Sequence, residues 1–477
     1  MKPPVAPVAL DYLAGAVRGA GYEPEILDLA FASDVSAEVA RRLSRAETRL
    51  VAVTFRNSDD CFWPSATSFV PQLVGMLRDV RSATDAPVVL GGSGFSLFPE
   101  AILHLCDAEF GVQGDGEAAL PSLLKALDGG GDLARVPGLV HRRTSADGAA
   151  WVRNPRPPAA RLSLDPGRDF VDNARYFREG GQIGVETKRG CDRACTYCAD
   201  PLIKGPTVRT RKPGEVADEV EALLAQGVDV LHLCDSEFNI PLDHAFAVCD
   251  ELAGRGAGER VKWYTYASVV PFPGGLARAM RRAGCVGVNF GADSASERML
   301  ATYGRRHRRA DIEGAAAACR ASGLRVMIDL LLGGPGETPA TVRETIDAIK
   351  SIGPDCAGAA LGVRIYPGTR IADQVMRGGP LVDNPNLRRR EGDRPAQAMG
   401  RERERRFLQP VFYISQALGE EPAQLVRDVI GGDQRFFEPV SEQSAENYNY
   451  NDNQPLIEAI RGGARGAYWD ILRQLRG

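Results

Sequence analysis

Apolar residues in the first 130 positions alternate between continuous runs and helical spacing. The continuous runs are typical of strands buried on both faces of a parallel sheet. They lie at 23–29, 50–55, 86–92 and 108–114. Segments with apolar residues at helical spacing separate them, at 10–22, 67–84, 99–106 and 117–127. This order predicts an α/β fold for residues 1–130, with a doubly wound, Rossmann-like sheet.

A second alternation of the same kind begins at residue 182. Strands are predicted at 182–188, 228–234, 261–268, 285–291, 325–333 and 358–366. Helices are predicted between them, at about 213–226, 243–255, 274–283, 309–321 and 338–351. Six strands with helical crossovers predict a partial (β/α)6 barrel over residues 182–370. Such barrels carry their active sites at the carboxyl ends of the strands.

The remaining segments are less regular. Residues 131–181 are rich in Gly, Pro and Arg, which indicates a linker with one hairpin. Residues 371–477 predict a smaller, mostly helical region for substrate binding or a lid. Within it, 455–475 predicts two helices separated by a glycine break, and the polar, aromatic stretch NYNYNDN (447–453) is a candidate lid together with GAYWD (466–470).

Composition restricts the partners and the compartment. The net charge is −4, with acidic and basic residues mixed, so no nucleic-acid partner is expected. No stretch approaches the ~18 apolar residues of a membrane helix, and no secretory signal is visible. Ten cysteines in 477 residues are too sparse for a disulfide scaffold. We therefore expect a monomer in a reducing cytoplasm, with a small molecule as substrate and without membrane contact.

Three cysteines stand close together in the stretch KRGCDRACTYCADPLIKG (188–205). Cys191, Cys195 and Cys198 have the spacing C-x3-C-x2-C, and no fourth cysteine lies within thirty residues on either side. Four-cysteine zinc sites and complete iron–sulfur clusters take four ligands. Three thiolates in one loop would hold three irons of a cubane and leave the fourth open to another ligand. A zinc loop or a chance cluster is the alternative interpretation.

This motif, with Tyr197 before the last cysteine and an apolar strand and a glycine before the first, closely resembles the radical S-adenosylmethionine superfamily. The resemblance implies a [4Fe-4S] cluster whose open iron is chelated by the amino and carboxylate groups of S-adenosylmethionine. It also implies an external electron donor of the flavodoxin or ferredoxin type, because reductive cleavage of the S–C5′ bond consumes an electron.

Other stretches match the same family. In CDSEFN (234–239), Glu237 occupies the position of the acidic residue that binds the amino group of S-adenosylmethionine; a helix cap or a surface acid is the alternative. FGADSASERMLATYGR (290–305) resembles the family's GxESxSxxxLxxxxK stretch. The resemblance puts Asp293 and Ser294 near the ribose or the methionine carboxylate and Arg305 where Lys or Arg is usual. Asp in place of the commoner Glu leaves the contact open.

The N-terminal domain resembles the cobalamin-binding domains fused in front of such barrels. Glycines allow the backbone to approach a bulky cofactor closely, and serines can donate to its nucleotide tail. The expected cofactor-binding residues are Ser58, Asp59, Gly91, Gly92, Ser93, Gly94, Phe95, Gly114, Gly116 and Glu117. A nucleotide-like domain without a cofactor is the alternative.

Two features depart from the pattern of cobalamin proteins. The D-x-H-x-x-G motif that supplies a lower histidine ligand to cobalt is absent, so we expect no histidine there. Arg56 is the candidate that faces the corrin and disfavours a further ligand on cobalt, which would favour methyl donation; an ion pair with Asp59 or Asp60 is the alternative. In addition, the chain starts with MKPPVAP where relatives have an apolar strand, so the first strand of this sheet is missing or supplied otherwise.

The motifs together resemble the branch that contains the tryptophan C-methylating enzyme of thiopeptide biosynthesis. The resemblance implies a cobalamin-dependent radical S-adenosylmethionine methyltransferase that acts on an unactivated carbon, with an aromatic amino acid as a candidate substrate and methylcobalamin as methyl carrier. Two alternatives stay open. One is a rearrangement, cyclisation or ring contraction with the same cofactors, and the other is a cobalamin-binding sensor with a structural cluster.

Alternate positions on the barrel strands give candidates for the substrate pocket. They are Tyr264, Tyr266, Asn289, Asp329 and Arg364, and Tyr266 is the candidate catalytic residue among them. Inward-facing strand residues belong to the core as often as to a pocket. Asp329 and Arg364 need partners if they are buried.

Overall fold

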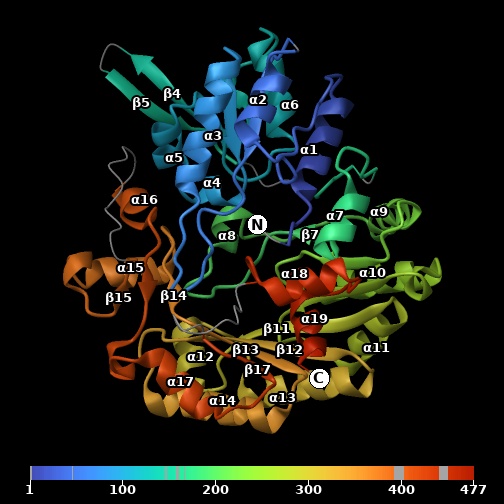
Figure 1. The fold of residues 1–477 in the computed structure, drawn as a ribbon, viewed down its shortest axis with the longest axis vertical. Helices are drawn as coiled ribbons and strands as arrows, with labels where there is room; N and C mark the ends of the chain where they lie inside the picture. The colour runs from blue at the N-terminus through green and yellow to red at the C-terminus, as the bar shows by residue number, and fades with distance from the viewer. Residues whose placement is uncertain are drawn as a thin grey trace.

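The chain folds into two main sheets with their helices, one above the other in Figure 1, and the described residues add two smaller sheets. The computed structural model describes residues 3–45, 47–145, 148–156, 161–165, 167–390, 402–439 and 450–476. The described part contains no helix that is both long and apolar enough to cross a membrane.

The first sheet has five strands in the order β1-β2-β3-β4-β5. They are β1 (Val51–Thr54), β2 (Val88–Gly91), β3 (Phe110–Val112), β4 (Leu139–Ser145) and β5 (Gly148–Arg153). The first three are parallel and were predicted; the hairpin β4–β5, inside the predicted linker, extends the sheet with antiparallel pairing. The strand predicted at 23–29 is wrong, because Leu27 and Leu29 pack against the core without pairing. The edge of the sheet is therefore β1.

Six helices accompany this sheet. They are α1 (Val8–Gly19), α2 (Val35–Leu43), α3 (Val70–Ala83), α4 (Ser93–Leu97), α5 (Pro99–Cys106) and α6 (Ala119–Leu127). The four predicted helices are confirmed. Helix α2 was not predicted; it begins after Asp34, whose side chain accepts a hydrogen bond from the backbone N–H of Ala37. Helix α7 (Asn173–Gly180) follows the hairpin and leads into the second sheet.

The second sheet is parallel and has seven strands in the order β17-β13-β12-β11-β10-β9-β6. They are β6 (Ile183–Val185), β9 (Val230–Leu233), β10 (Lys262–Ala267), β11 (Cys285–Asp293), β12 (Arg325–Leu332), β13 (Cys356–Leu361) and β17 (Phe436–Phe437). The six predicted strands are confirmed, and the two-residue β17 is too short to predict. At Gly362 (φ 94°) the predicted last strand breaks, and β14 (Val363–Arg364) joins a separate sheet with β15 (Leu387–Arg388) and β16 (Phe412–Tyr413).

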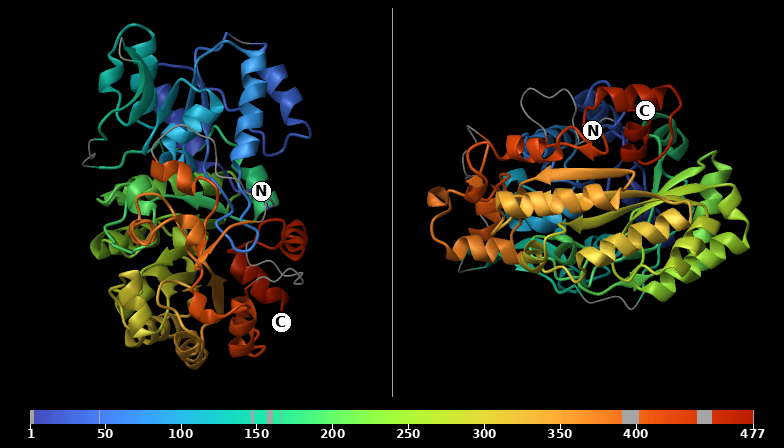
Figure 2. Two further views of the ribbon diagram at one scale, coloured as in Figure 1. Left: turned by 90° about the vertical axis from the view of Figure 1, so that its left-hand side faces the viewer. Right: turned by 90° about the horizontal axis from the view of Figure 1, so that it is seen from below.

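The five predicted crossover helices cover the outer face of this partial barrel, which is seen from below in the right-hand view of Figure 2. They are α9 (Pro213–Ala225), α10 (Leu242–Gly254), α11 (Gly274–Arg282), α13 (Arg309–Ala321) and α14 (Pro339–Ile352). The shorter helices are α8 (Asp200–Ile203), α12 (Glu297–Tyr303), α15 (Arg370–Arg377), α16 (Glu402–Phe407) and α17 (Pro422–Ile430).

The end of the chain closes the inside of the barrel. Helices α18 (Gln454–Arg461) and α19 (Tyr468–Leu475) confirm the predicted pair with a glycine break. The fully buried carboxylate of Asp470 accepts a hydrogen bond from the Tyr264 hydroxyl at 2.8 Å and forms an ion pair with Arg325. Tyr264 therefore belongs to the packing around α19. Of the predicted lid, residues 447–449 lie outside the described residues.

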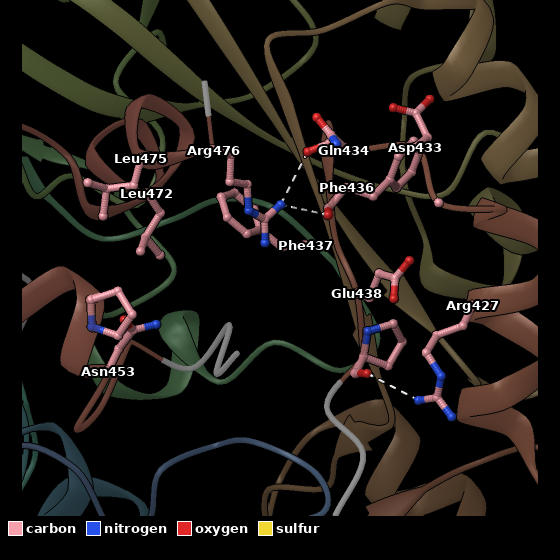
Figure 3. Close-up of a pocket in the computed structure, with 13 residues that line it drawn as sticks. Arg427, Asp433, Gln434, Phe436, Phe437, Glu438, Asn453, Leu472, Leu475 and Arg476 are labelled. Carbon is pink, nitrogen blue, oxygen red and sulfur yellow. Dashed lines mark hydrogen bonds between the residues drawn. The ribbon is translucent and has the colours of Figure 1, made fainter. Parts of the chain in front are cut away.

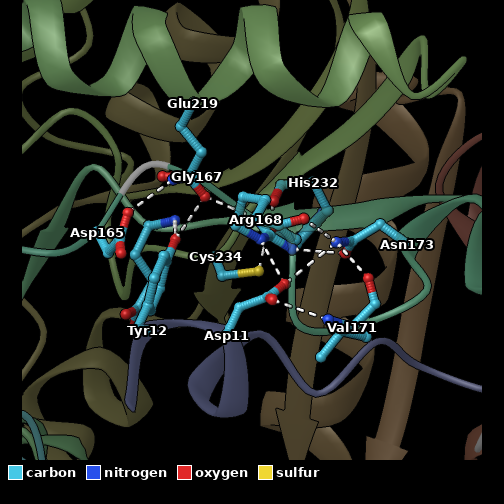
Figure 4. A network of polar contacts seen from close by, with 12 residues as sticks. Asp11, Tyr12, Asp165, Gly167, Arg168, Val171, Asn173, Glu219, His232 and Cys234 are labelled. Carbon is cyan, nitrogen blue, oxygen red and sulfur yellow. Dashed lines mark hydrogen bonds and ion pairs between the residues drawn. The ribbon is translucent and has the colours of Figure 1, made fainter. Parts of the chain in front are cut away.

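A buried polar network joins the first helix to the barrel (Figure 4). The side chain of Arg168 has no exposed surface and donates to Asp11 at 2.9 Å, to Glu219 at 2.6 Å and to Asn173 at 2.9 Å. It also donates to the carbonyl oxygen of Gly184 on β6 at 2.9 Å. The network thus ties α1, the segment before α7, and α9 together.

We expect Arg168→Met to destabilise the protein strongly. Removal of Arg168 leaves the buried Asp11 carboxylate without its cation and leaves Glu219 with Arg211 as its remaining ion-pair partner. Loss of one partner from a buried ion pair typically costs about 3–5 kcal/mol. The measurement is the apparent free energy of unfolding in urea. The control is Arg18→Met, which removes exposed ion pairs to Asp165 and Asp169 and should leave the unfolding midpoint unchanged. Equal effects of the two substitutions would contradict the role of Arg168.

Candidate functional site

The cysteine loop starts at the end of β7 (Lys188–Arg189), which follows the first barrel strand, β6, in the chain. Gly190 has φ 102°, and a side chain there would overlap the carbonyl oxygen of Thr207. The backbone N–H of Cys191 then donates to the carbonyl oxygen of Gly205 at 3.1 Å. Glycine is therefore required before the first cysteine so that the loop can turn tightly over its own return segment.

The buried carboxylate of Asp235 fixes the start of this loop. It accepts hydrogen bonds from the Thr187 N–H at 2.8 Å and the Thr187 hydroxyl at 2.5 Å, and it pairs with the Lys188 ammonium at 2.9 Å. The same ammonium donates to the carbonyl oxygen of Phe238. The motif CDSEFN, after β9, thus holds the cysteine loop as well as carrying Glu237.

A cavity of about 130 Å³ brings the three cysteines together with other predicted site residues. Its lining residues are Cys191, Arg193, Cys195, Tyr197, Cys198, Asp200, Pro201, Ser236, Glu237, Tyr266, Gly291 and Arg305. The sequence did not single out Arg193, Asp200 or Ser236. Only their position in the sequence, next to the motif cysteines and Glu237, could have identified them as site residues. In the structure, the Ser236 hydroxyl donates a hydrogen bond to Asp200 at 2.5 Å.

The thiols fit an iron–sulfur cluster. Burial raises the pKa of Cys191 to about 11, and burial also raises the pKa of Cys195, with the Arg305 guanidinium opposing it. Arg305 donates to the sulfur of Cys195 at 3.0 Å. Among the described residues, no three His, Cys, Asp or Glu side chains lie close enough together to hold a single metal ion. A cubane needs no such arrangement, because each of three irons takes one thiolate, and its binding displaces the thiol protons.

Glu237 supplies a carboxyl group to the same cavity. Burial raises its pKa to about 7, and the positive charge of Arg305 opposes this shift. A carboxyl group that loses solvation in this way gains from a bound cation by a charge-assisted hydrogen bond. Glu237 therefore fits the amino group of S-adenosylmethionine, the role that the sequence predicts.

Asp293 links two of the residues that line the cavity, Tyr197 and Arg305. Its carboxylate accepts a hydrogen bond from the Tyr197 hydroxyl at 2.6 Å and lies 3.3 Å from Arg305, and its backbone has φ 64°. The side chain of Ser294 is fully buried and shares a hydrogen bond of 2.7 Å with Thr345 on α14, and its place near S-adenosylmethionine stays a prediction.

Two of the glycines expected to contact cobalamin are needed by the protein itself. A side chain on Gly92 (φ 98°) would begin 2.7 Å from the carbonyl oxygen of Phe55, and one on Gly94 would begin 2.7 Å from the Ser58 nitrogen. They let α4 pack against the residues after β1. Gly91 differs, because a side-chain carbon added there would meet only the carbonyl oxygen of Val112, at an ordinary contact distance of 3.9 Å, and its contact with a cofactor stays a prediction.

Further residues of the expected cobalamin set have partners inside the protein. Ser58 donates to Asp59, whose carboxylate accepts from Arg364 at 2.8 Å, so Asp59 and Arg364 are buried ion-pair partners, and their contacts with a bound molecule stay predictions. Phe95 is fully buried and packs against Gly111, in the core.

The loop after β3 is engaged as well. Glu117 forms an ion pair with Arg189 at 3.0 Å, Gly114 (φ 91°) lies against Arg156, and Gly116 lies against Leu13. These contacts involve residues that the sequence analysis assigned to cobalamin, and their contacts with that cofactor stay predictions. Ser93 is half-buried at the start of α4, and its contact with a cofactor stays a prediction.

Arg56 reaches toward the barrel from the end of β1. It is exposed and has no ion-pair partner among the described residues, so the alternative pairing with Asp59 or Asp60 is not observed. The charge of Arg56 acts on His232, on β9. Burial is the main cause that lowers the pKa of His232 to about 4, and the positive charge of Arg56 lowers it further. Burial raises the pKa of Tyr468, and Arg56 opposes this shift. Its position under cobalt stays a prediction.

Tyr266 lines the cysteine cavity from β10. Its side chain is 40% exposed, yet burial raises its pKa and the charge of Asp329 raises it further. The exposed surface of Tyr266 therefore faces the cavity, where the surrounding protein desolvates its phenol strongly. Its ring meets that of His232 edge to face, with centroids 5.4 Å apart. Of the predicted pocket residues, Tyr266, Asn289 and Asp329 remain candidates.

A larger cavity of about 510 Å³ lies between α17, β17 and α19 (Figure 3). Arg427, Phe436 and Arg476 are among its lining residues. None of the cysteines and none of the predicted site residues line it. The chemistry that the sequence indicates therefore belongs to the smaller cavity at the barrel mouth.

Comparisons with known proteins agree with both halves of the chain. Residues 185–349 match the Radical SAM superfamily, and residues 2–124 match the B12 binding domain. The tryptophan 2-C-methyltransferase of Streptomyces laurentii is 31% identical, over 98% of this chain and 94% of the relative.

Solved structures show the same architecture. The radical S-adenosylmethionine methyltransferase TsrM from Kitasatospora setae, with cobalamin and a [4Fe-4S] cluster bound, matches with a TM-score of 0.87 and 30% identity, covering 100% of this chain and 96% of that one. A second TsrM structure, with tryptophan and the analogue aza-SAM bound, has a TM-score of 0.87 and 31% identity, over 100% and 97%. OxsB, at 16% identity and a TM-score of 0.71 over 91% and 66%, shares the fold.

We expect Cys198→Ala to abolish cluster binding, because two thiolates in this loop cannot hold a cubane that takes three. After anaerobic reconstitution, iron content and visible charge-transfer absorbance should fall to a small fraction of the wild-type values. The matched control is Cys319→Ala in α13, a buried cysteine outside the loop, which should retain both. A normal cluster in the Cys198 variant would overturn the assignment.

Proposed function

We propose that this chain, which belongs to the cobalamin-dependent radical S-adenosylmethionine methyltransferases, methylates a ring carbon of tryptophan or of a closely related aromatic amino acid. The observation that carries the proposal is the shared cavity, in which the three cysteines and the partly exposed Tyr266 meet at the barrel mouth. The relatives with tryptophan in their names support the choice of substrate, because they match nearly the whole chain.

The enzyme uses a [4Fe-4S] cluster, S-adenosylmethionine and cobalamin. When bound, these groups supply a methyl donor, a methyl carrier on cobalt and an electron source. In our proposal the three cysteines hold the cluster, and Glu237 and Tyr197 position S-adenosylmethionine. Gly91 and Ser93 would contact bound cobalamin, and the guanidinium of Arg56 would lie near its cobalt and disfavour a further ligand there.

Aromatic side chains form the proposed substrate wall. Tyr450 and Tyr468 meet with ring centroids 5.7 Å apart, and burial raises the pKa of Tyr450, with Asp329 and Tyr266 adding to the shift. Flat aromatic surfaces bind an indole ring by stacked or edge-to-face contacts. Because the pKa of Tyr266 is raised, its phenol stays protonated near neutral pH. It therefore acts as a hydrogen-bond donor that orients the substrate, not as a base.

The proposal also covers the domain boundaries of the chain, its cellular compartment and its electron donor. Residues 1–130 bind cobalamin, 131–181 link, 182–370 form the radical barrel, and 371–477 complete the substrate site. A reducing cytoplasm, a monomeric state and an external electron donor of the flavodoxin or ferredoxin type are parts of the same proposal. The cluster and the free cysteines favour such a compartment.

Reconstituted enzyme should transfer the methyl group of methyl-labelled S-adenosylmethionine to tryptophan. The expected product carries the label and is heavier by one methylene unit in mass spectrometry, because a methyl group replaces a ring hydrogen. A rearrangement, cyclisation or ring contraction would give an unlabelled product. Cofactor-loaded enzyme that modifies aromatic amino acids without incorporating label would sink the proposal.

Arg56→Ala should change the environment of cobalt. Loss of the guanidinium lets water reach the lower face, so the electron paramagnetic resonance spectrum of bound cob(II)alamin should show one additional axial ligand, and methyl transfer should slow. The control is Arg49→Ala, which removes an exposed ion pair with Asp128 and should leave the spectrum unchanged. An unaltered spectrum for the Arg56 variant would argue against this role.

A further inference from the structure

The guanidinium group of Arg305 contacts the sulfur of a motif cysteine in the cavity at the barrel mouth. Its Nη1 atom donates to the Sγ atom of Cys195 at 3.0 Å, and both residues line that cavity. Its Nη2 atom donates to the carbonyl oxygen of Gly291, and its Nε atom lies 3.3 Å from the Asp293 carboxylate. Only 7% of the arginine side chain is exposed. Three acceptors therefore fix the orientation of a nearly buried cation.

The backbone holds this arginine against the cysteine loop. Helix α12 ends at Tyr303, whose carbonyl oxygen accepts a hydrogen bond from the Thr196 N–H at 2.9 Å. Gly304 follows with φ 71°, and a side chain there would begin 2.8 Å from the carbonyl oxygen of Ala194. Because glycine allows this close approach, the chain passes directly over the loop. The next residue is the arginine, which is thereby placed beside the thiol.

The contact distinguishes one cysteine from the other two. Cys191 and Cys198 accept hydrogen bonds from the backbone N–H groups of Arg193 and Asp200, and no charged side chain donates to their sulfurs in the described part of the chain. Arg305 brings a full positive charge to the remaining sulfur. Hydrogen bonds to the sulfurs and the charge around a cluster both set its reduction potential. The position of this cation is therefore chemically significant.

We propose that Arg305 raises the reduction potential of the iron–sulfur cluster through its hydrogen bond to Cys195. Reduction adds one electron, supplied by the external donor, and with it one negative charge. A cation in contact with a ligating sulfur stabilises the more negative state. Asp293 opposes this effect, because its carboxylate partly neutralises the guanidinium. The inference rests on the proposed binding of the cluster by the three cysteines and is independent of the substrate.

The test is an anaerobic redox titration of the reconstituted holoenzyme, in which electron paramagnetic resonance reports the reduced cluster. Arg305→Met removes both the charge and the donor. At a fixed potential, the ratio of reduced to oxidised cluster should fall at least about tenfold, a shift of about 59 mV to lower potential for one electron. The matched control is Arg306→Met, which removes an exposed arginine at the next position and should leave the potential unchanged, because solvent screens its charge.

Asp293→Asn should shift the potential in the opposite direction. It removes the carboxylate that offsets the guanidinium, so the reduced fraction at a fixed potential should rise. Damage to the loop would give a different pattern, because water that reaches the cluster stabilises its more negative form and would raise the potential in both variants. If Arg305→Met assembles no cluster, Asp293→Asn decides alone: a higher potential at full iron content supports the inference, and an unchanged one overturns it.

Binding of S-adenosylmethionine separates this role of Arg305 from a direct contact with that cofactor. The Kd for S-adenosylmethionine, measured by calorimetric titration of the holoenzyme, should stay unchanged in Arg305→Met. A higher Kd with an unchanged cluster potential would contradict the inference, because the guanidinium would then bind the carboxylate of the cofactor.

The outcomes also distinguish this inference from the proposed function. If the potential of Arg305→Met equals that of the wild-type enzyme, and the wild-type enzyme methylates tryptophan, the inference is wrong and the proposed function stands. If the wild-type protein assembles no cluster, both are wrong.

Discussion

The relative position of the two cofactor-binding halves depends on charges buried between them. Asp59, after β1, pairs with Arg364 at 2.8 Å, and Asp115 and Glu117, after β3, pair with Arg189 at 3.1 and 3.0 Å. Such pairs add little net stability, because desolvation offsets their attraction. A separated buried charge is costly, however, so every arrangement of the halves that breaks these pairs is disfavoured. The pairs therefore fix the relative position of the two halves, and two cofactors that act on one substrate require such a fixed arrangement.

Arg189 connects this geometry to the cysteines. It lies two residues before Cys191, and its guanidinium also donates to Glu186 at 2.5 Å. Neighbouring Arg209, on β8 (Arg209–Thr210), pairs with Asp115 as well. The cysteine loop and the loop after β3 thus share one set of ion pairs. A shift of either loop would move the other, and for this reason the position of the three cysteines is linked to that of the N-terminal domain.

The helices and strands could be predicted from the sequence better than the contacts between residues that are far apart in the chain. The barrel strands were predicted correctly because continuous apolar runs leave few alternatives, and the cysteine spacing identified the loop because it needs no distant partner. The contacts that the sequence did not predict join residues far along the chain: Asp59 and Arg364 are 305 residues apart, and Ser294 and Thr345 are 51 apart. Motif reading assigned those polar groups to ligands because nothing local satisfies them. The segment 23–29 failed differently, since apolar spacing fits a packed extended chain as well as a strand.

The same limit explains why the cavity walls could be named only in part. Whether an inward-facing residue belongs to core or pocket depends on what the end of the chain covers, and here Asp470 of α19 takes Tyr264 out of the pocket. What is left open combines small residues with strongly desolvated polar groups, among them Tyr266, Glu237 and the thiols. Desolvation strengthens each electrostatic contact inside the site and keeps water from reactive species.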